Sequence, residues 1–284
     1  MENKEEIILK LKEVFLSKNI FAIEHYPRTW EDSWGGDYFG ISFSNEVYLE
    51  DKDALEILLS LLKDSNATIR SYAAWGLGLY KHRSEKAIPV LLESLRDDKG
   101  ENVAYKIAYA LGEIARNEEL VIPELLNMAL NNNDNMVRQA AVDAIGGFKE
   151  KGQKAIDQLL KLLENDNFYQ VRAMAAKSLG QIKVKTDEVT SGLLFALKFD
   201  KNSWVRTKCA EAIGELDIKE FEEHLIEELF ANQKEHYEKY SFVFAILRIN
   251  RSNKQVKQVL EKMIQNNELS SFEIHQIEKY ELLK

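Results

Sequence analysis

The chain has 284 residues, of which 45% are hydrophobic, and its formal net charge is −9. This acidic balance argues against a general binder of nucleic-acid phosphates. The single cysteine, Cys209, excludes an intrachain disulfide and a cysteine-based zinc site, so we expect it to be a small buried core residue. The chain shows no signal-peptide pattern and no run of about 18 apolar residues. These features predict a cytoplasmic protein with no membrane span.

The N-terminal residues 3–18 carry apolar side chains at helical spacing. This pattern predicts an amphipathic helix with one buried face. The residues expected on that face are Ile7, Ile8, Leu11, Val14, Phe15 and Leu16.

The next segment, residues 20–50, is rich in aromatic side chains and glycine, unlike everything that follows. Apolar and polar residues alternate around Ile41 and around Val47, which is compatible with a short β-hairpin. We expect the segment either to cap the open end of the following array or to act as a binding lid. The lid residues would be Trp30, Trp34 and Tyr38.

A 34-residue period organises the chain from residue 51 onward. A β-branched residue stands nine positions before each glycine of a regular column, and each repeat predicts two helices joined by a turn. Glycine inside a helix costs about 1 kcal/mol relative to alanine, so five glycines in register imply the close approach of a neighbouring helix. The glycines of this column are Gly78, Gly112, Gly146, Gly180 and Gly214.

The first helix of each repeat carries a leucine at one fixed position, which predicts its buried face. These leucines are Leu58, Leu92, Leu126, Leu160 and Leu194. We therefore predict an all-α fold, a right-handed superhelical solenoid of about six or seven helix pairs, and a monomer. Three segments are expected: residues 1–50 as an N-terminal helix and aromatic cap, 51–249 as the repeat array, and 250–284 as a C-terminal capping helix pair.

The second helices read Val-Arg-x-x-Ala-Ala-x-Ala-Leu-Gly, with an Asp in the preceding turn. This motif resembles the HEAT repeat, in particular the short bacterial subtype of the phycobilisome lyases. The resemblance implies a structural ladder of turn aspartates and helix arginines, interrupted where Ala104 and Asn132 replace them. The implied members are Asp64, Asp98, Asp166 and Asp200 with Arg70, Arg138, Arg172 and Arg206.

No pattern indicates catalysis. HEAT-fold hydroxylases bind iron through His-Glu dipeptides, and none of the five histidines here is followed by glutamate. Phosphate loops and nucleophile elbows are also absent from the sequence. We therefore expect no enzyme activity, no catalytic residue, no metal and no cofactor.

Aromatic residues gather on the second helices of the first two repeats. Tyrosine and tryptophan dominate interaction hot spots, so we predict a protein or peptide partner on the concave face. In the alternative, the N-terminal segment covers these rings and they belong to the core. The predicted contact residues are Tyr72, Trp75, Tyr105, Lys106, Tyr109, Asp143 and Lys177.

Three functions fit this surface. The first is a non-enzymatic protein-binding scaffold, and the second is an immunity-type inhibitor of a basic toxin domain, for which an acidic surface is suited. The third, a chromophore lyase or chaperone, is implied by the resemblance to phycobilisome lyases. The few bases on the predicted concave face make nucleic acid an unsuitable partner.

Overall fold

The computed structural model describes residues 4–17, 40–42, 48–98, 102–231 and 236–283. The predicted lid residues Trp30, Trp34 and Tyr38 lie outside these ranges. The described chain is all-α apart from two short strands, and its helices pack in sequential pairs, so the predicted solenoid is confirmed. The chain forms two compact units, Met1–Asn132 and Asn133–Lys284. The three predicted segments stay a prediction.

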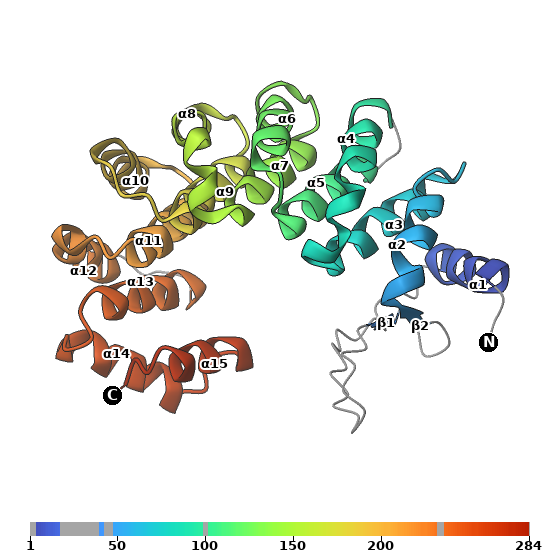
Figure 1. Cartoon of the computed structure of the whole chain (residues 1–284). Helices are drawn as coiled ribbons and strands as arrows, with labels where there is room; N and C mark the ends of the chain where they lie inside the picture. The colour runs from blue at the N-terminus through green and yellow to red at the C-terminus, as the bar shows by residue number, and fades with distance from the viewer. Residues whose placement is uncertain (1–3, 18–39, 43–47, 99–101, 232–235, 284) are drawn as a thin grey trace. The chain divides into compact units, whose positions relative to one another are not determined.

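Unit 1 contains the N-terminal helix and the helices up to the third repeat (Figure 1). Strands β1 and β2 pair antiparallel, with Ile41 opposite Leu49, in the segment where alternation allowed a hairpin. The elements are α1 (Lys4–Ser17), β1 (Gly40–Ser42), β2 (Tyr48–Glu50), α2 (Asp51–Leu61), α3 (Ala67–Leu79), the 3-10 helix η2 (Lys81–Ala87), α4 (Ile88–Asp97), α5 (Val103–Ile114) and α6 (Glu118–Asn131).

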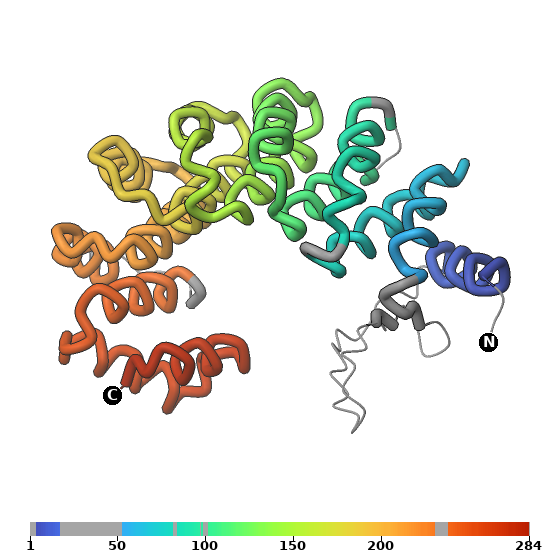
Figure 2. The backbone as a smooth tube through the Cα atoms, viewed as in Figure 1, coloured from blue at the N-terminus to red at the C-terminus, as the bar shows by residue number. Residues whose placement is uncertain are grey.

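Unit 2 contains the remaining helices, and their path is clearest in the backbone trace (Figure 2). Helices α8, α10 and α12 form one layer, while α9, α11 and α13 form the other (Figure 1). The elements are α7 (Asn135–Gly147), η3 (Lys149–Ala155), α8 (Ile156–Asn165), α9 (Tyr169–Ile182), α10 (Asp187–Phe199), α11 (Ser203–Glu215), η4 (Lys219–Phe221), α12 (Glu222–Ala231), α13 (His236–Ile249), α14 (Lys254–Gln265) and α15 (Ser271–Lys279).

The burial of the N-terminal helix differs from the predicted face. Leu11 and Phe15 of α1 are fully buried, but Leu16 is 49% exposed. Successive helical residues are about 100° apart, so Leu16 points away from the stripe formed by Leu11 and Phe15. The predicted buried face is therefore wrong at Leu16.

Four of the five glycines of the column bring neighbouring second helices into backbone contact, as predicted: Gly78, Gly146, Gly180 and Gly214. A Cβ added at Gly78 would lie 2.9 Å from the Cα of Ala110, and one added at Gly180 would lie 2.9 Å from the Cα of Ala212. Gly214 is equally restricted, because a Cβ there would lie 2.8 Å from the Cα of Ala245. Real Cβ atoms do not approach so closely, so these positions exclude any larger residue.

The first helices pack less tightly. Of the leucines at the fixed repeat position, Leu58 and Leu92 are buried, but Leu126, Leu160 and Leu194 are only half-buried, which corrects their predicted placement. In unit 2 the second helices meet closely, while the first helices α8 and α10 line a groove between them.

A large side chain ends the glycine column. Arg248 of α13 stands 34 residues after Gly214. Its guanidinium lies 4.8 Å from the ring centroid of Tyr280 and 5.7 Å from that of Phe244. The contact with Tyr280 attaches the C-terminal end of the chain to α13. In four of the preceding repeats, a glycine at this position allows the next second helix to pack closely.

The second helices begin at a side-chain cap in three repeats. Asn66, Asp134 and Asn202 each accept a hydrogen bond from the backbone N–H two residues later. Phe168 occupies the equivalent position of α9 and makes no such bond. Because a capping side chain satisfies an otherwise unpaired N–H, this helix start is weaker than its neighbours.

We expect Phe168→Asn to increase the free energy of unfolding by about 1 kcal/mol, since asparagine caps a helix start where phenylalanine cannot. Urea unfolding followed by circular dichroism measures the change. Asn202→Ala serves as the matched control and should cost a similar amount. A Phe168→Asn protein no more stable than the wild type would contradict this account.

Candidate functional site

The predicted aromatic residues of unit 1 form one cluster. Tyr72 and Trp75 of α3 contact each other edge to face, with ring centroids 6.4 Å apart and an interplanar angle of 74°. From α5, Lys106 places its Nζ 5.6 Å from the centroids of both Trp75 and Tyr105. Tyr109 lies beside Gly78, where the missing side chain leaves it room. We call Tyr72, Trp75, Tyr105, Lys106 and Tyr109 the aromatic cluster.

Helical spacing explains this arrangement. Tyr72 and Trp75 are three residues apart on α3, so they share one face, as do Tyr105 and Tyr109 of α5. The close contact at Gly78 and Ala110 then brings these two faces together. The rings are consequently held by two rigid helices and not by loops.

The N-terminal helix supports the aromatic cluster from one side. The buried ring of Phe15 lies 5.5 Å from that of Tyr72, at an interplanar angle of 34°. All five members of the cluster nevertheless stay half-buried. Within the described residues, α1 packs against the cluster without burying it. The alternative in which the N-terminal segment covers the rings falls on residues outside the described ranges and stays a prediction.

The lysine of the cluster sits in an unusual environment for an ammonium group. Burial lowers the pKa of Lys106 from its ordinary value of 10.5. The two ring faces attract the charged form through their quadrupoles. The cluster thus combines apolar ring surface with one partly desolvated cation, a combination that suits an aromatic or acidic group of a partner.

Asp143 and Lys177, the remaining predicted contact residues, belong to unit 2. Lys177 Nζ lies 2.6 Å from Asp143 Oδ1, so α9 and α7 are joined by this ion pair. Both side chains are just over a third exposed, and such pairs add little stability. Asp143 and Lys177 therefore contact each other within unit 2.

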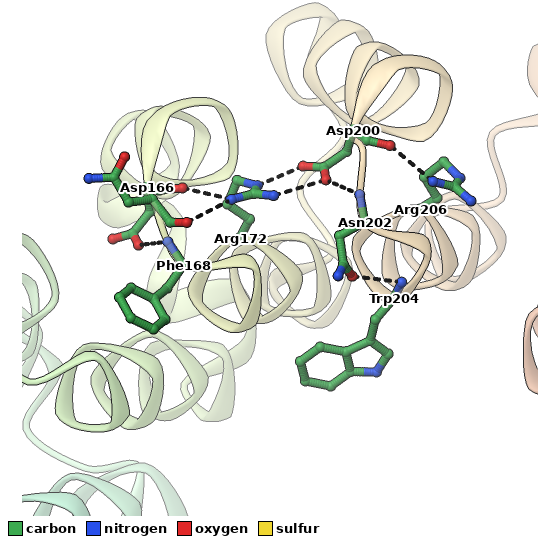
Figure 3. Close-up of polar contacts among 8 residues, drawn as sticks. Asp166, Phe168, Arg172, Asp200, Asn202, Trp204 and Arg206 are labelled. Atoms are coloured by element: carbon green, nitrogen blue, oxygen red, sulfur yellow. Dashed lines mark hydrogen bonds and ion pairs between the residues drawn. The ribbon is translucent and has the colours of Figure 1, made fainter.

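The predicted ladder is present, and Figure 3 shows one of its rungs, in which Arg172 reaches forward to the next repeat. Arg172 donates to both carboxylate oxygens of Asp200, at 2.6 and 3.0 Å. It also donates to the backbone carbonyl of Asp166 in its own repeat, at 2.8 Å. Asp200 in turn accepts the N–H of Asn202 at 2.9 Å, which fixes the turn. Each rung therefore joins a turn, a second helix and the next repeat.

The same pairing recurs in both units. Arg70 binds Asp98 in unit 1, and Arg138 binds Asp166 in unit 2. The hydrogen bonds that Arg70 donates to Asp98 raise the pKa of Arg70, and those that Arg172 donates to Asp200 raise the pKa of Arg172. These charges are committed to structure, as the family resemblance implied.

Residues outside the motif complete the two ends of the ladder. Lys12 of α1 pairs with Asp64 at 2.7 Å, and Arg206 pairs with Glu238 of α13 at 3.2 Å. Burial acts to raise the pKa of Asp64, but hydrogen bonds from Lys12 and Asn66 outweigh it and hold the pKa below 3.8. The stabilisation from Asp64 is therefore present above pH 3.8 and declines as the pH falls further.

The remaining features predicted from the sequence concern the cysteine, metal ligands and membrane spans. Cys209 is fully buried as predicted, and burial raises the pKa of its thiol. Among the described residues, no three His, Cys, Asp or Glu side chains are grouped so as to hold a metal ion. Within the same residues, no helix has the length and apolar character needed to span a bilayer.

Comparison with known proteins identifies the repeats. The model of the family described as HEAT repeats matches residues 47–112, 122–214 and 156–230, which together cover more than half of the chain. The chain belongs to the HEAT-repeat family. The resemblance found in the sequence is thus confirmed, and the ladder and glycine column are features of this protein's HEAT repeats.

One solved structure similar to this HEAT-repeat protein is the complex of CpcE and CpcF of phycocyanin lyase from Nostoc sp. PCC7120. The identity is 22%, and the match covers 56% of this chain and 97% of that chain with a TM-score of 0.47. A search of curated proteins gave no significant match.

Sequence reasoning missed a second surface, on the first helices of unit 2. Phe195 and Phe199 of α10 are exposed and contact each other, with ring centroids 5.0 Å apart. A signal was present in the sequence, because the second, third and fourth repeats carry polar residues at both positions.

Proposed function

We propose that this HEAT-repeat protein is a non-enzymatic scaffold that binds a protein or peptide partner at the aromatic cluster. The observation that carries the proposal is the half-exposed set of Tyr72, Trp75 and Tyr105 rings around Lys106, held by two rigid helices. Repeat arrays use such extended helical surfaces for binding.

The chemistry of the cluster favours a partner with an exposed aromatic or acidic side chain. Tyrosine and tryptophan supply large contact areas and lose little conformational entropy on binding, which makes them frequent hot spots. Lys106 is already partly desolvated, so an incoming carboxylate would pay a smaller penalty than at a fully hydrated lysine. Preorganisation by α3 and α5 further favours affinity.

We expect Trp75→Ala together with Tyr105→Ala to weaken partner binding at least tenfold, because each aromatic anchor contributes about 1–2 kcal/mol. Affinity capture from native lysate identifies the partner, and titration of the purified partner measures the affinity. Tyr72 is left in place because it packs on Phe15.

The control variant is Phe272→Ala, which removes a 70% exposed aromatic side chain from α15 in unit 2. It should bind the partner as the wild type does. Circular dichroism should show that both variants are folded at the temperature of the binding measurement. Equal affinity of the Trp75→Ala/Tyr105→Ala protein and the wild type would exclude the aromatic cluster as the binding site.

The net charge of −9 favours a second candidate, the immunity-type inhibitor of a basic toxin domain. Opposite charges accelerate association, which suits an inhibitor that must capture a toxin quickly. A toxin gene directly beside the gene for this protein would support this candidate over a general scaffold. The chromophore-lyase alternative stays a prediction from the family resemblance.

A further inference from the structure

A groove separates α8 from α10, the first helices of the fourth and fifth repeats. Its volume is about 600 Å³. Leu160, Leu163, Phe195, Ala196 and Phe199 supply its apolar lining. Phe195 is 57% and Phe199 is 66% exposed, so the two rings form an apolar surface open to solvent. The groove lies on the first helices, whereas the aromatic cluster lies on second helices of unit 1.

Gly192 is one of the residues that line the groove. A Cβ added to Gly192 would lie 2.7 Å from Cδ2 of Leu160, so the missing side chain lets Leu160 of α8 lie against the backbone of α10. The preceding repeats have Glu56, Val90, Glu124 and Gln158 at this position. The fifth repeat therefore differs from the others at a residue that lines the groove.

The repeats themselves provide the reference for the two exposed rings. Phe195 stands where the second, third and fourth repeats have the polar residues Glu93, Asn127 and Lys161 and the first has Leu59. Phe199 replaces the polar residues Lys63, Asp97, Asn131 and Asn165. In three of the four preceding repeats, solenoid packing thus works with polar residues at both positions. The phenylalanines are not required by the fold, and exposing them is unfavourable unless something covers them.

The equivalent groove of unit 1 shows the contrast. It lies beside α4 and has a similar volume of about 560 Å³. Its lining includes Lys63, Glu93 and Ser94 together with the rung Arg70–Asp98. A groove at this position thus occurs in both units, and of these two the one between α8 and α10 has the more apolar lining.

Charged groups stand at both ends of the apolar groove. Glu188 is at the start of α10 and Glu164 near the end of α8, while Lys201 lies beside the Glu164 end. The Arg172–Asp200 rung at the floor is already paired. Position 164 corresponds to position 198 of α10, so the two glutamates are about ten helical residues, or about 15 Å, apart along the groove.

We propose that this groove binds an amphipathic helix of a partner protein. The helix has about three turns, an apolar stripe that covers Phe195 and Phe199, and a basic residue near each end that faces Glu164 or Glu188. A compact ligand held between α8 and α10 would leave the outer faces of the two rings in water. A helix lying along the groove covers them, because helices pack with their axes about 8–10 Å apart.

The test uses a fluorescein-labelled amphipathic peptide of leucine and lysine, about 14 residues long, which is enough for three to four helical turns. Fluorescence anisotropy at physiological ionic strength measures its affinity for the full-length protein. The binding variant is F195N/F199N, which installs the residues of Asn127 and Asn131 from the third repeat and changes no charge. We expect it to bind the peptide at least tenfold more weakly than the wild type.

Three controls define the outcome. Glu93→Ala, in the polar groove of unit 1, should bind the peptide as the wild type does. A peptide of leucine and glutamate should bind the wild type at least tenfold more weakly than the leucine–lysine peptide, since it meets Glu164 and Glu188 with like charge. Trp75→Ala/Tyr105→Ala should leave the peptide affinity unchanged, so failure of the groove and failure of the aromatic cluster are separable.

Two results would overturn the proposal. One is equal affinity of the leucine–lysine peptide for the wild type and for F195N/F199N. The other is a wild-type dimer that becomes a monomer in F195N/F199N, measured by light scattering, because a second copy would then occupy the groove. Because both rings are exposed, we expect F195N/F199N to fold as the wild type does. Circular dichroism checks this.

Discussion

Asp200→Ala should lower the free energy of unfolding by about 3 kcal/mol, a larger effect than removal of any surface ion pair. The carboxylate is only 7% exposed and accepts hydrogen bonds from Arg172 and from the N–H of Asn202. Its removal leaves the Arg172 guanidinium, itself 16% exposed, without its countercharge. Urea unfolding followed by circular dichroism measures the change.

Glu220→Ala is the matched control for this prediction. It removes the carboxylate of an exposed ion pair with Lys185, whose side chains are 42% and 54% exposed. Water already solvates both groups, so the unfolding curve should not shift measurably. If Asp200→Ala were as stable as Glu220→Ala, the ladder would not stabilise the array.

The interrupted rung allows the reverse test, in which the missing ion pair is added and the gain in stability is measured. Ala104 and Asn132, both in unit 1, have the 28-residue separation of each Arg–Asp rung. Arginine and aspartate are thus missing together at one rung. The double variant Ala104→Arg/Asn132→Asp should show a favourable coupling energy of about 1 kcal/mol relative to the two single variants. Additive single effects would show that the geometry at this rung differs from the others.

The direction of the ladder could not be obtained from the sequence. The motif identified the aspartates and arginines, but not that Arg172 binds the next repeat's carboxylate and its own repeat's carbonyl. The terminal partners Lys12 and Glu238 were also missed, because they lie outside the motif. A periodic pattern predicts the contacts that recur in every repeat. It does not predict contacts that are made only once, at the two ends of the ladder.

The backbone conformation at the ends of these second helices could not be predicted from the sequence either. Five residues there have a positive φ, between 44° and 59°, and none is a glycine. Sequence reasoning looks for glycine at such helix ends, since it adopts the left-handed conformation without strain. The residues are Lys81, Ala115, Lys149, Lys183 and Asp217.

The candidate sites differ in how far the sequence revealed them. The aromatic cluster was found because its residues interrupt an otherwise regular second helix. Its half-burial depends on α1, whose contact between Phe15 and Tyr72 no spacing rule predicts. The groove between α8 and α10 requires comparison of first helices, where Phe195 and Gly192 depart from the preceding repeats. Both candidate sites thus lie at positions that vary between repeats, while the invariant positions hold the array together.

The second large effect concerns the invariant positions. Gly180→Val should lower the free energy of unfolding by about 3 kcal/mol, because its Cβ would lie 2.9 Å from both the Cα and the Cβ of Ala212. The obstructing Cα belongs to the backbone of α11, which cannot move without opening the contact between α9 and α11. Urea unfolding of the full-length protein measures the loss.

Gly192→Ala is the control, since it also adds a Cβ to a helical glycine. There the near atom is Cδ2 of Leu160, at the end of a flexible side chain that can rotate away. Alanine also favours the helix by about 1 kcal/mol, so this variant should be as stable as the wild type or slightly more so. Ala212→Gly should rescue Gly180→Val only in part, because the Cα of residue 212 remains in place. Full rescue would mean that side-chain crowding, and not backbone contact, requires the glycine column.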